Sequence, residues 1–207
     1  MDKKAAVITG DLIDSSSLVP LERKKLQQTL DNFFNKAKAK WPDLISQQYR
    51  GDSLQIILTD NRKYSLRLTL LLQSLLMSKQ YKIRLALGIG DITYSSKNVV
   101  TSDGSAFRAS GPYLDELKKR SEFISIAGST PDITEEWQVH SMSLNFLIQR
   151  WSPHQAEAIN LMLQEHTQEE IAAKVKIAQP SVHQRLQLAG WPVVQKILNR
   201  FETATAL

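Results

Sequence analysis

The segment Lys4-Ala5-Ala6-Val7-Ile8-Thr9-Gly10-Asp11 (KAAVITGD) opens the pattern that decides the fold. Its first six residues form a short apolar run that predicts a strand, and Gly10-Asp11 is expected to end that strand. A helix is predicted from about Pro20, because proline suits a first helical turn. Apolar residues then recur at helical spacing on one face: Leu26, Leu30, Phe33, Phe34 and Ala37.

Further along the chain, strands and helices alternate up to about residue 130. Strands are predicted at 44–49 and 54–58, on either side of Arg50-Gly51-Asp52-Ser53, a sequence typical of a hairpin with Gly-Asp at its tip. A leucine-rich helix, a strand at 83–89, a helix at 106–119 and a strand at 123–127 follow. The order β-α-β-β-α-β, then α-β, predicts an α+β, ferredoxin-like domain, with an antiparallel sheet and its helices on one face.

From about Asp132 onward every pattern is helical. Thr167-Gln168-Glu169-Glu170 is a capping box that opens a short helix, and a second helix is expected to start at Gln179 with Pro180 in its first turn. Two short helices joined by a tight turn form a helix-turn-helix. We therefore expect two domains, an α+β domain at 1–130 and a helical helix-turn-helix domain at 131–207.

Composition excludes several classes of protein. No cysteine occurs among the 207 residues, which excludes disulfides, thiolate nucleophiles and Cys-ligated metal sites. The longest apolar stretch, residues 68–77, is broken by polar residues and is far shorter than the roughly 20 residues that span a bilayer. The apolar run before Gly10 is too short for a signal peptide. We expect a cytoplasmic protein with no membrane partner.

Two carboxylates of the first domain are expected to meet. Asp11 follows the first strand and Asp52 lies at the hairpin tip, and the first and third strands of a ferredoxin-like sheet are neighbours. Converging carboxylates repel unless a hard cation lies between them, and Ser15 and Ser16 precede a helix N-terminus that favours phosphate. The alternative is a structural role, in which Asp11 only accepts hydrogen bonds within its loop and Gly51-Asp52 only provides the backbone angles of a hairpin turn.

Four segments resemble class III nucleotidyl cyclases: residues 6–16 (AVITGDLIDSS), 49–54 (YRGDSL), 83–91 (IRLALGIGD) and 104–111 (GSAFRASG). The resemblance implies that Asp11 and Asp52 bind Mg²⁺ or Mn²⁺ together with a nucleotide, assisted by the carbonyl of Leu12. It also implies nucleotide or phosphate contacts from Ser15, Ser16 and Arg108. In these cyclases the 3′-hydroxyl of the ribose attacks the α-phosphate between two metal ions.

The chain departs from the cyclase pattern at the residues that support turnover. Cyclases carry an Asn that holds the ribose and, one turn later, an Arg that stabilises the developing charge. No Asn occurs here between Asn98 and Asn145, and Arg108 alone is suitably placed. Catalytic residues are therefore not assigned, and nucleotide and metal binding are expected in preference to cyclase turnover.

As a whole, the chain is similar to the bacterial SatD family, in which a cyclase-like domain precedes a C-terminal helix-turn-helix. Cyclase-like sites usually form between two copies, so a homodimer is expected. The resemblance predicts the order of the domains, but it does not assign a biochemical activity to particular residues.

The second short helix is predicted to contact DNA. Arg suits guanine, Gln suits adenine, and Ser suits either a base or a phosphate. The candidate DNA-binding residues are Gln179, Ser181, His183, Gln184 and Arg185.

The net charge of +5 does not support this prediction. Residues 151–207 carry five cations and five anions, so the surplus lies in 1–150, where 21 Lys and Arg face 16 Asp and Glu. Because phosphate contacts need clustered cations, a neutral module requires dimerisation or help from the basic domain. The alternative is a helical bundle that only packs or dimerises.

Two functions follow. The first is a DNA-binding regulator whose cyclase-like domain senses a nucleotide or a metal. The second is a metal-dependent nucleotide-processing enzyme whose helical part dimerises or regulates. A scaffold without a ligand is the remaining alternative.

Overall fold

The computed structural model describes residues 3–49, 51–92, 104–128 and 130–206. Arg50, in the predicted hairpin, lies outside these residues. The sheet has the order β2-β3-β1-β4-β5, so the first and third strands are neighbours as predicted. The strands are β1 (Lys3–Leu12), β2 (Ile45–Tyr49), β3 (Ser53–Leu58), β4 (Ile83–Ile92) and β5 (Ile124–Ala127).

The first strand is longer than its sequence predicts. Gly10-Asp11 does not end β1, because Asp11 still pairs with Ser53 of β3 and with Arg84 of β4. In a central strand, hydrogen bonds to the neighbouring strands on both sides outweigh the local preference of Gly and Asp for turns. Asp11 therefore lies within the sheet.

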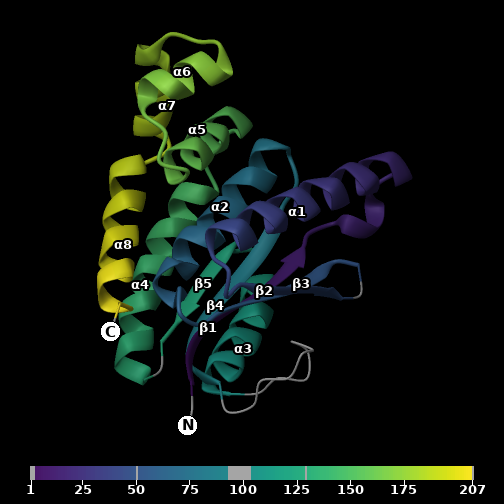
Figure 1. Ribbon diagram of the computed structural model, residues 1–207, viewed down its shortest axis with the longest axis vertical. Helices are drawn as coiled ribbons and strands as arrows, with labels where there is room; N and C mark the ends of the chain where they lie inside the picture. Colours follow the sequence, from purple (N-terminus) through teal and green to yellow (C-terminus); the bar gives the residue numbers. More distant parts are fainter. Residues whose placement is uncertain (1–2, 50, 93–103, 129, 207) are drawn as a thin grey trace.

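The predicted antiparallel sheet with helices on one face is wrong in two respects. Strand β5 runs parallel to β4, so the sheet is mixed. Helices α1 (Pro20–Lys40) and α2 (Ser65–Ser78) cover one face, whereas α3 (Ser105–Arg120) packs on the other, against Ala5 and Val7 (Figure 1). A connection between parallel strands must cross over a face of the sheet, and α3 is that crossover.

Helix α4 (Pro131–Ile148) covers the edge strand β5 with polar side chains. Asn145 accepts hydrogen bonds from the backbone N–H groups of Phe123 and Ile124, at 2.9 and 3.0 Å, and donates to the carbonyl of Ile124 at 2.8 Å. Ser141 accepts from the N–H of Ile126. Side chains of α4 thus form hydrogen bonds with backbone groups on the outer edge of β5, which protects this edge from pairing with another chain.

The remaining helices are α5 (Pro153–Leu163), α6 (Gln168–Val175), α7 (Gln179–Leu188) and α8 (Trp191–Ala204). The predicted capping box of α6 is present, with Thr167 and Glu170 each bonded to the other's backbone N–H. Lys176 ends α6 in the left-handed region, where glycine is common. Among the described residues, no helix has the length and hydrophobicity needed to span a membrane.

The C-terminal helices pack against α2. Asn160 of α5 donates to the carbonyl of Leu71 at 2.8 Å, and Arg67 of α2 pairs with Glu202 of α8 at 2.8 Å. The buried apolar side chains of both regions belong to one cluster. The division into domains at 1–130 and 131–207 stays a prediction.

Hydrogen bonds to Asp43 stabilise the turn that follows β3. Its carboxylate accepts from the N–H groups of Thr59 and Asn61 at 2.8 and 3.1 Å, and from the Asn61 amide. Burial by itself would raise the pKa of Asp43, but these hydrogen bonds outweigh it and hold the pKa below its ordinary value of 3.8.

We expect Asp43→Ala to lower the free energy of unfolding at pH 7 by about 1 kcal/mol, since the site is partly exposed. A depressed folded pKa gives stability that is present above pH 3.8 and is lost as the pH falls through the folded value. The deficit of the variant should therefore shrink below pH 3.8. Urea unfolding at several pH values measures it, with Asp115→Ala, an exposed aspartate, as the control. A deficit independent of pH would contradict the role of the charge.

Candidate functional site

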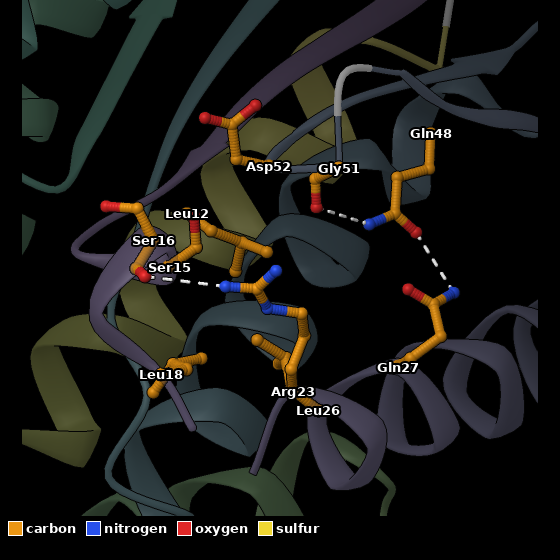
Figure 2. Close-up of a pocket in the computed structure, with 10 residues that line it drawn as sticks. All are labelled: Leu12, Ser15, Ser16, Leu18, Arg23, Leu26, Gln27, Gln48, Gly51 and Asp52. Atoms are coloured by element: carbon orange, nitrogen blue, oxygen red, sulfur yellow. Dashed lines mark hydrogen bonds between the residues drawn. The ribbon is translucent and has the colours of Figure 1, made fainter. Parts of the chain in front are cut away.

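A cavity of about 230 Å³ opens between the end of β1, the β2–β3 hairpin and the start of α1 (Figure 2). Four of the residues predicted for the site line it, namely Leu12, Ser15, Ser16 and Asp52. The sequence did not predict its other lining residues as site residues; these are Leu18, Arg23, Leu26, Gln27, Gln48 and Gly51.

Backbone contacts hold the two loops of the cavity together. The N–H of Leu12 donates to the carbonyl of Asp52 at 2.9 Å, which fixes the hairpin tip beside the end of β1. Gly51 has a φ of 79°, a left-handed conformation that glycine adopts without strain. On the other side, residues Ser15–Ser17 form a single 3-10 turn before α1. The serine turn and the hairpin tip therefore face the same cavity.

Polar side chains of α1 complete the wall. Arg23 donates from Nη2 to the carbonyl of Ser16 at 3.4 Å. Gln27 donates to the Gln48 amide oxygen at 3.1 Å, and Gln48 donates to the carbonyl of Gly51 at 3.0 Å (Figure 2). A cation in the first turn of α1, six residues after the serine turn, is the sequence signal that would have identified Arg23.

Asp11 lies on the opposite face of the sheet from Leu12. Its carboxylate is 3.5 Å from Lys118 Nζ of α3 and 3.7 Å from Arg84 Nη1, and its side chain is only 14% exposed. Asp11 does not line the cavity, although its neighbour Leu12 does. The side chains alternate between the two faces of a strand, which explains the separation.

Ser53 connects the two aspartates. It is the register partner of Asp11, so the two side chains lie next to each other on one face, with Cβ atoms about 5 Å apart. Its hydroxyl donates to Asp52 Oδ1 at 3.3 Å. In the view of Figure 2, the Asp52 carboxylate is directed away from the Arg23 guanidinium. Asp52 therefore lies at the rim, with its carboxylate bonded to the register partner of Asp11.

Arg84 has an unused hydrogen-bond donor. Its Nε is buried and has no hydrogen-bond partner in the described part of the chain. An unsatisfied buried donor costs free energy, and an anionic ligand would satisfy it. The orphaned atom lies on the guanidinium that contacts Asp11, at the same end of the sheet as the hairpin.

The donor set fits Mg²⁺ or Mn²⁺ only in combination with a ligand. No group of three or more His, Cys, Asp or Glu is placed to hold a metal ion within the described residues. Magnesium, however, is commonly held by one or two carboxylates and completed by phosphate oxygens and water. Asp11, Asp52 and the Leu12 carbonyl offer hard oxygen donors of this kind, and their assignment as ligands stays a prediction.

Arg108 lies at the other end of α3 from Lys118. The two residues are ten positions apart, which is about 15 Å of helix. Because Lys118 contacts Asp11, Arg108 is remote from this cavity in the same copy of the chain, and it does not line it.

On α7 the structure exposes most of the residues predicted to contact DNA. Ser181, His183 and Gln184 are exposed, Arg185 is half-buried, and Gln179 donates to the Gln168 amide oxygen at 2.7 Å. Val182 and Leu186, on the other side of α7, are buried against the rest of the protein. A role in DNA binding stays a prediction.

Solved structures of nucleotidyl cyclases are similar to part of the chain. A bacterial light-regulated adenylyl cyclase is 9% identical, with a TM-score of 0.45, and the match covers 61% of this chain and 77% of that one. The adenylyl cyclase CyaB from P. aeruginosa is 16% identical, with a TM-score of 0.43 and coverage of 61% and 78%. The catalytic core of a rhodopsin-guanylyl cyclase in complex with ATPalphaS is 13% identical, with a TM-score of 0.43 and coverage of 66% and 81%.

Comparison with curated protein sequences finds no significant match. The family model described as the SatD family matches residues 5–205. Because the match spans almost all of the 207 residues, the chain belongs to the SatD family.

Proposed function

We propose that the chain binds the phosphates of a nucleoside triphosphate, together with Mg²⁺ or Mn²⁺, at the cavity between the β1 end, the β2–β3 hairpin and α1. One observation carries the proposal: Asp52 lines this cavity together with the serine turn and Arg23, and Asp11 pairs with Ser53, the residue that follows Asp52. Carboxylates favour the cation, and the cation and Arg23 favour phosphate.

The carboxylates and the hydroxyl groups of the site would have different roles. Asp11 and Asp52 would hold the cation, with the Leu12 carbonyl, and Ser15 and Ser16 would offer hydroxyl and backbone donors to phosphate oxygens. When bound, the cation would neutralise phosphate charge and polarise the phosphoryl oxygens. Arg84 and Lys118, which now contact Asp11, would then be available to a negatively charged ligand.

Turnover by a cyclase reaction requires residues from a second copy. Arg108 is the one cation of the segment 104–111, which resembles the start of a cyclase helix, and it is about 15 Å of helix away from Lys118. In a homodimer, Arg108 of one copy would approach the cavity of the other. We therefore propose a nucleotide-processing or nucleotide-sensing homodimer, in which binding is a property of each copy and any turnover depends on the pair.

Thermal unfolding tests the proposal. ATP or GTP with Mn²⁺ should raise the Tm of the chain by several degrees, since a ligand that binds the folded state stabilises it by mass action. The nucleotide with a chelator should give no shift, and Mn²⁺ alone should not give the full shift. Asp52→Asn should lose the metal-dependent part.

The matched control is Asp14→Asn. Asp14 lies three residues after Asp11, is exposed, and has a φ of 55°, a conformation that asparagine tolerates well. This variant should keep the full shift. Equal shifts in wild type and Asp52→Asn, or no shift with any nucleotide and metal, would contradict the proposed site.

A second candidate function is DNA binding by α7. The observation that favours it is the geometry of α6 and α7: a three-residue connection, a left-handed Lys176, and an outward row of Ser181, His183 and Gln184. A regulator of this kind would sense the nucleotide in the first 130 residues and read a DNA site with α7.

Selection of bound fragments from genomic DNA tests this second candidate. The chain should enrich particular sequences over random DNA, and Arg185→Ala should reduce the preference at one base position by about 1–3 kcal/mol. Lys38→Ala, which removes an exposed cation on α1, should leave the preference unchanged. Recovery of random sequences alone would exclude sequence-specific DNA binding.

A further inference from the structure

A second and larger cavity lies away from the nucleotide site, between α1, α2 and α5. Its volume is about 490 Å³, within the range of small-molecule sites in proteins. In Figure 1, α1 and α2 lie side by side, and α5 lies beyond them at the end that leads to the C-terminal helices. None of the residues predicted for the nucleotide or the DNA site lines this cavity. It is lined by Thr29, Asn32, Phe33, Lys36, Ala37, Lys40, Trp41, Leu71, Leu75, Lys79, Asn160 and Gln164.

The apolar part of the lining is partly aromatic. Trp41 is 3% exposed and Leu71 is 8% exposed, and the side chains of Phe33 and Leu75 are half-buried beside them. Aromatic and aliphatic surfaces that remain reachable from a cavity favour an apolar body, because contact with it removes water from both surfaces. The lining therefore suits a molecule with a hydrocarbon or aromatic body.

The charged part of the lining has one sign. Lys36, Lys40 and Lys79 line the cavity and no carboxylate does. Lys40 is partly compensated, because its Nζ is 3.6 Å from Glu165 and 5.4 Å from the Trp41 ring centroid. The described residues provide no ion pair for Lys36 or Lys79. Two uncompensated cations beside an apolar surface favour an anionic group at the rim.

Amides at the α5 side define the remaining polar wall. Asn160 is 7% exposed, and its Nδ2 is already bonded to the Leu71 carbonyl and to Ser74 Oγ, at 2.8 and 3.0 Å. Gln164 donates to Asn160 Oδ1 at 2.6 Å. Because hydrogen bonds to α2 and within α5 hold these amides in place, this wall is preorganised, which lowers the conformational entropy lost when a ligand binds.

We propose that this cavity binds a small amphipathic organic anion, with its apolar body against Trp41, Phe33 and Leu75 and its carboxylate, sulfonate or phosphate between Lys36 and Lys79. The ligand contacts α1 and α2 of the sheet domain and α5 of the C-terminal helices at once. Binding therefore stabilises the packing of these two regions against each other.

Anilinonaphthalene sulfonate, an aromatic anion whose fluorescence rises in apolar sites, tests the proposal on the full chain. Wild type should bind one probe saturably, and Lys36→Gln/Lys79→Gln should weaken the affinity about tenfold, the loss expected for two partly exposed charge contacts. High salt should weaken wild type in the same direction. Lys38→Gln, on the opposite side of α1, is the matched control and should bind like wild type.

A second variant tests the cavity without changing its charge. Leu75→Trp places an indole in the space between α1 and α2 and should weaken probe binding more than tenfold, while circular dichroism shows a folded chain. Asp52→Asn should leave probe binding unchanged, which separates this site from the nucleotide site. Absence of saturable binding, or equal affinity in wild type and both cavity variants, would overturn the proposal. So would binding to phosphatidylglycerol vesicles through Lys36 and Lys79 without binding of the free probe.

Discussion

Asn145→Leu should lower the free energy of unfolding by about 4 kcal/mol, because it removes every hydrogen bond that the Asn145 side chain makes to β5. The backbone N–H groups of Phe123 and Ile124 and the carbonyl of Ile124 would lose their partners at a site where Asn145 is 3% exposed. Leucine has the same branched shape but larger end groups, so the loss combines the unsatisfied backbone groups with some overpacking. Urea unfolding measures it.

Asn35→Leu is the control for this change. Asn35 is exposed on α1, and the same substitution there should change stability by less than about 0.5 kcal/mol. If Asn145→Leu does not fold, Asn145→Asp keeps an acceptor oxygen for Phe123 and Ile124 but turns a second, charged oxygen toward the Ile124 carbonyl, so it should also be destabilised at pH 7. Equal stability of wild type and Asn145→Leu would mean that the edge of β5 does not depend on α4.

Gly88→Ala should destabilise the chain by about 3 kcal/mol through a single methyl group. A Cβ at Gly88 would lie 2.3 Å from the carbonyl oxygen of Ala106 and 2.9 Å from the N of Ser110, both backbone atoms of α3. Backbone cannot move aside without shifting the helix. Because α3 also carries Lys118, which contacts Asp11, such a shift would reach the proposed metal site.

Gly111→Ala is the matched control on the same helix. Apart from the chain neighbours and the helix's own backbone, nothing lies within 4 Å of a Cβ at Gly111. The gain in helix propensity, about 0.5–1 kcal/mol, is opposed by Pro112, which disfavours a Cβ on the helical residue before it, so this variant should stay within about 1 kcal/mol of wild type. Thermal and urea unfolding compare the two variants. A Gly88→Ala chain as stable as wild type would show that α3 is not packed this closely on β4.

The strand and helix order could be predicted because each element carries its own periodicity. The hairpin is an example: the turn sequence around Gly51-Asp52 separates two short runs, and the strands predicted at 44–49 and 54–58 lie within a residue of the observed bounds of β2 and β3. The face taken by α3 could not be predicted in this way. It depends on Gly88 and Gly90, which leave room for α3, and a glycine in a strand pattern does not reveal what approaches it.

The candidate site was predictable where local sequence decides it. Asp52, Ser15 and Ser16 line one cavity because a hairpin tip and a pre-helix turn each have a fixed local geometry. Partners from distant segments could not be predicted, such as Arg84 and Lys118 at Asp11, because they depend on strand register and on the position of α3. The same holds for the α1–α2–α5 cavity, which joins three elements far apart in the sequence.

Equilibrium dialysis with labelled ATP or GTP tests the central proposal, that Asp11 and Asp52 hold a divalent cation together with a nucleotide. Wild type and Asp14→Asn should retain one nucleotide per chain with Mn²⁺ and none with a chelator. Asp11→Asn/Asp52→Asn should retain none in either condition. Nucleotide retention that persists with the chelator or in the double variant would contradict the proposal, as would no retention by wild type with Mn²⁺.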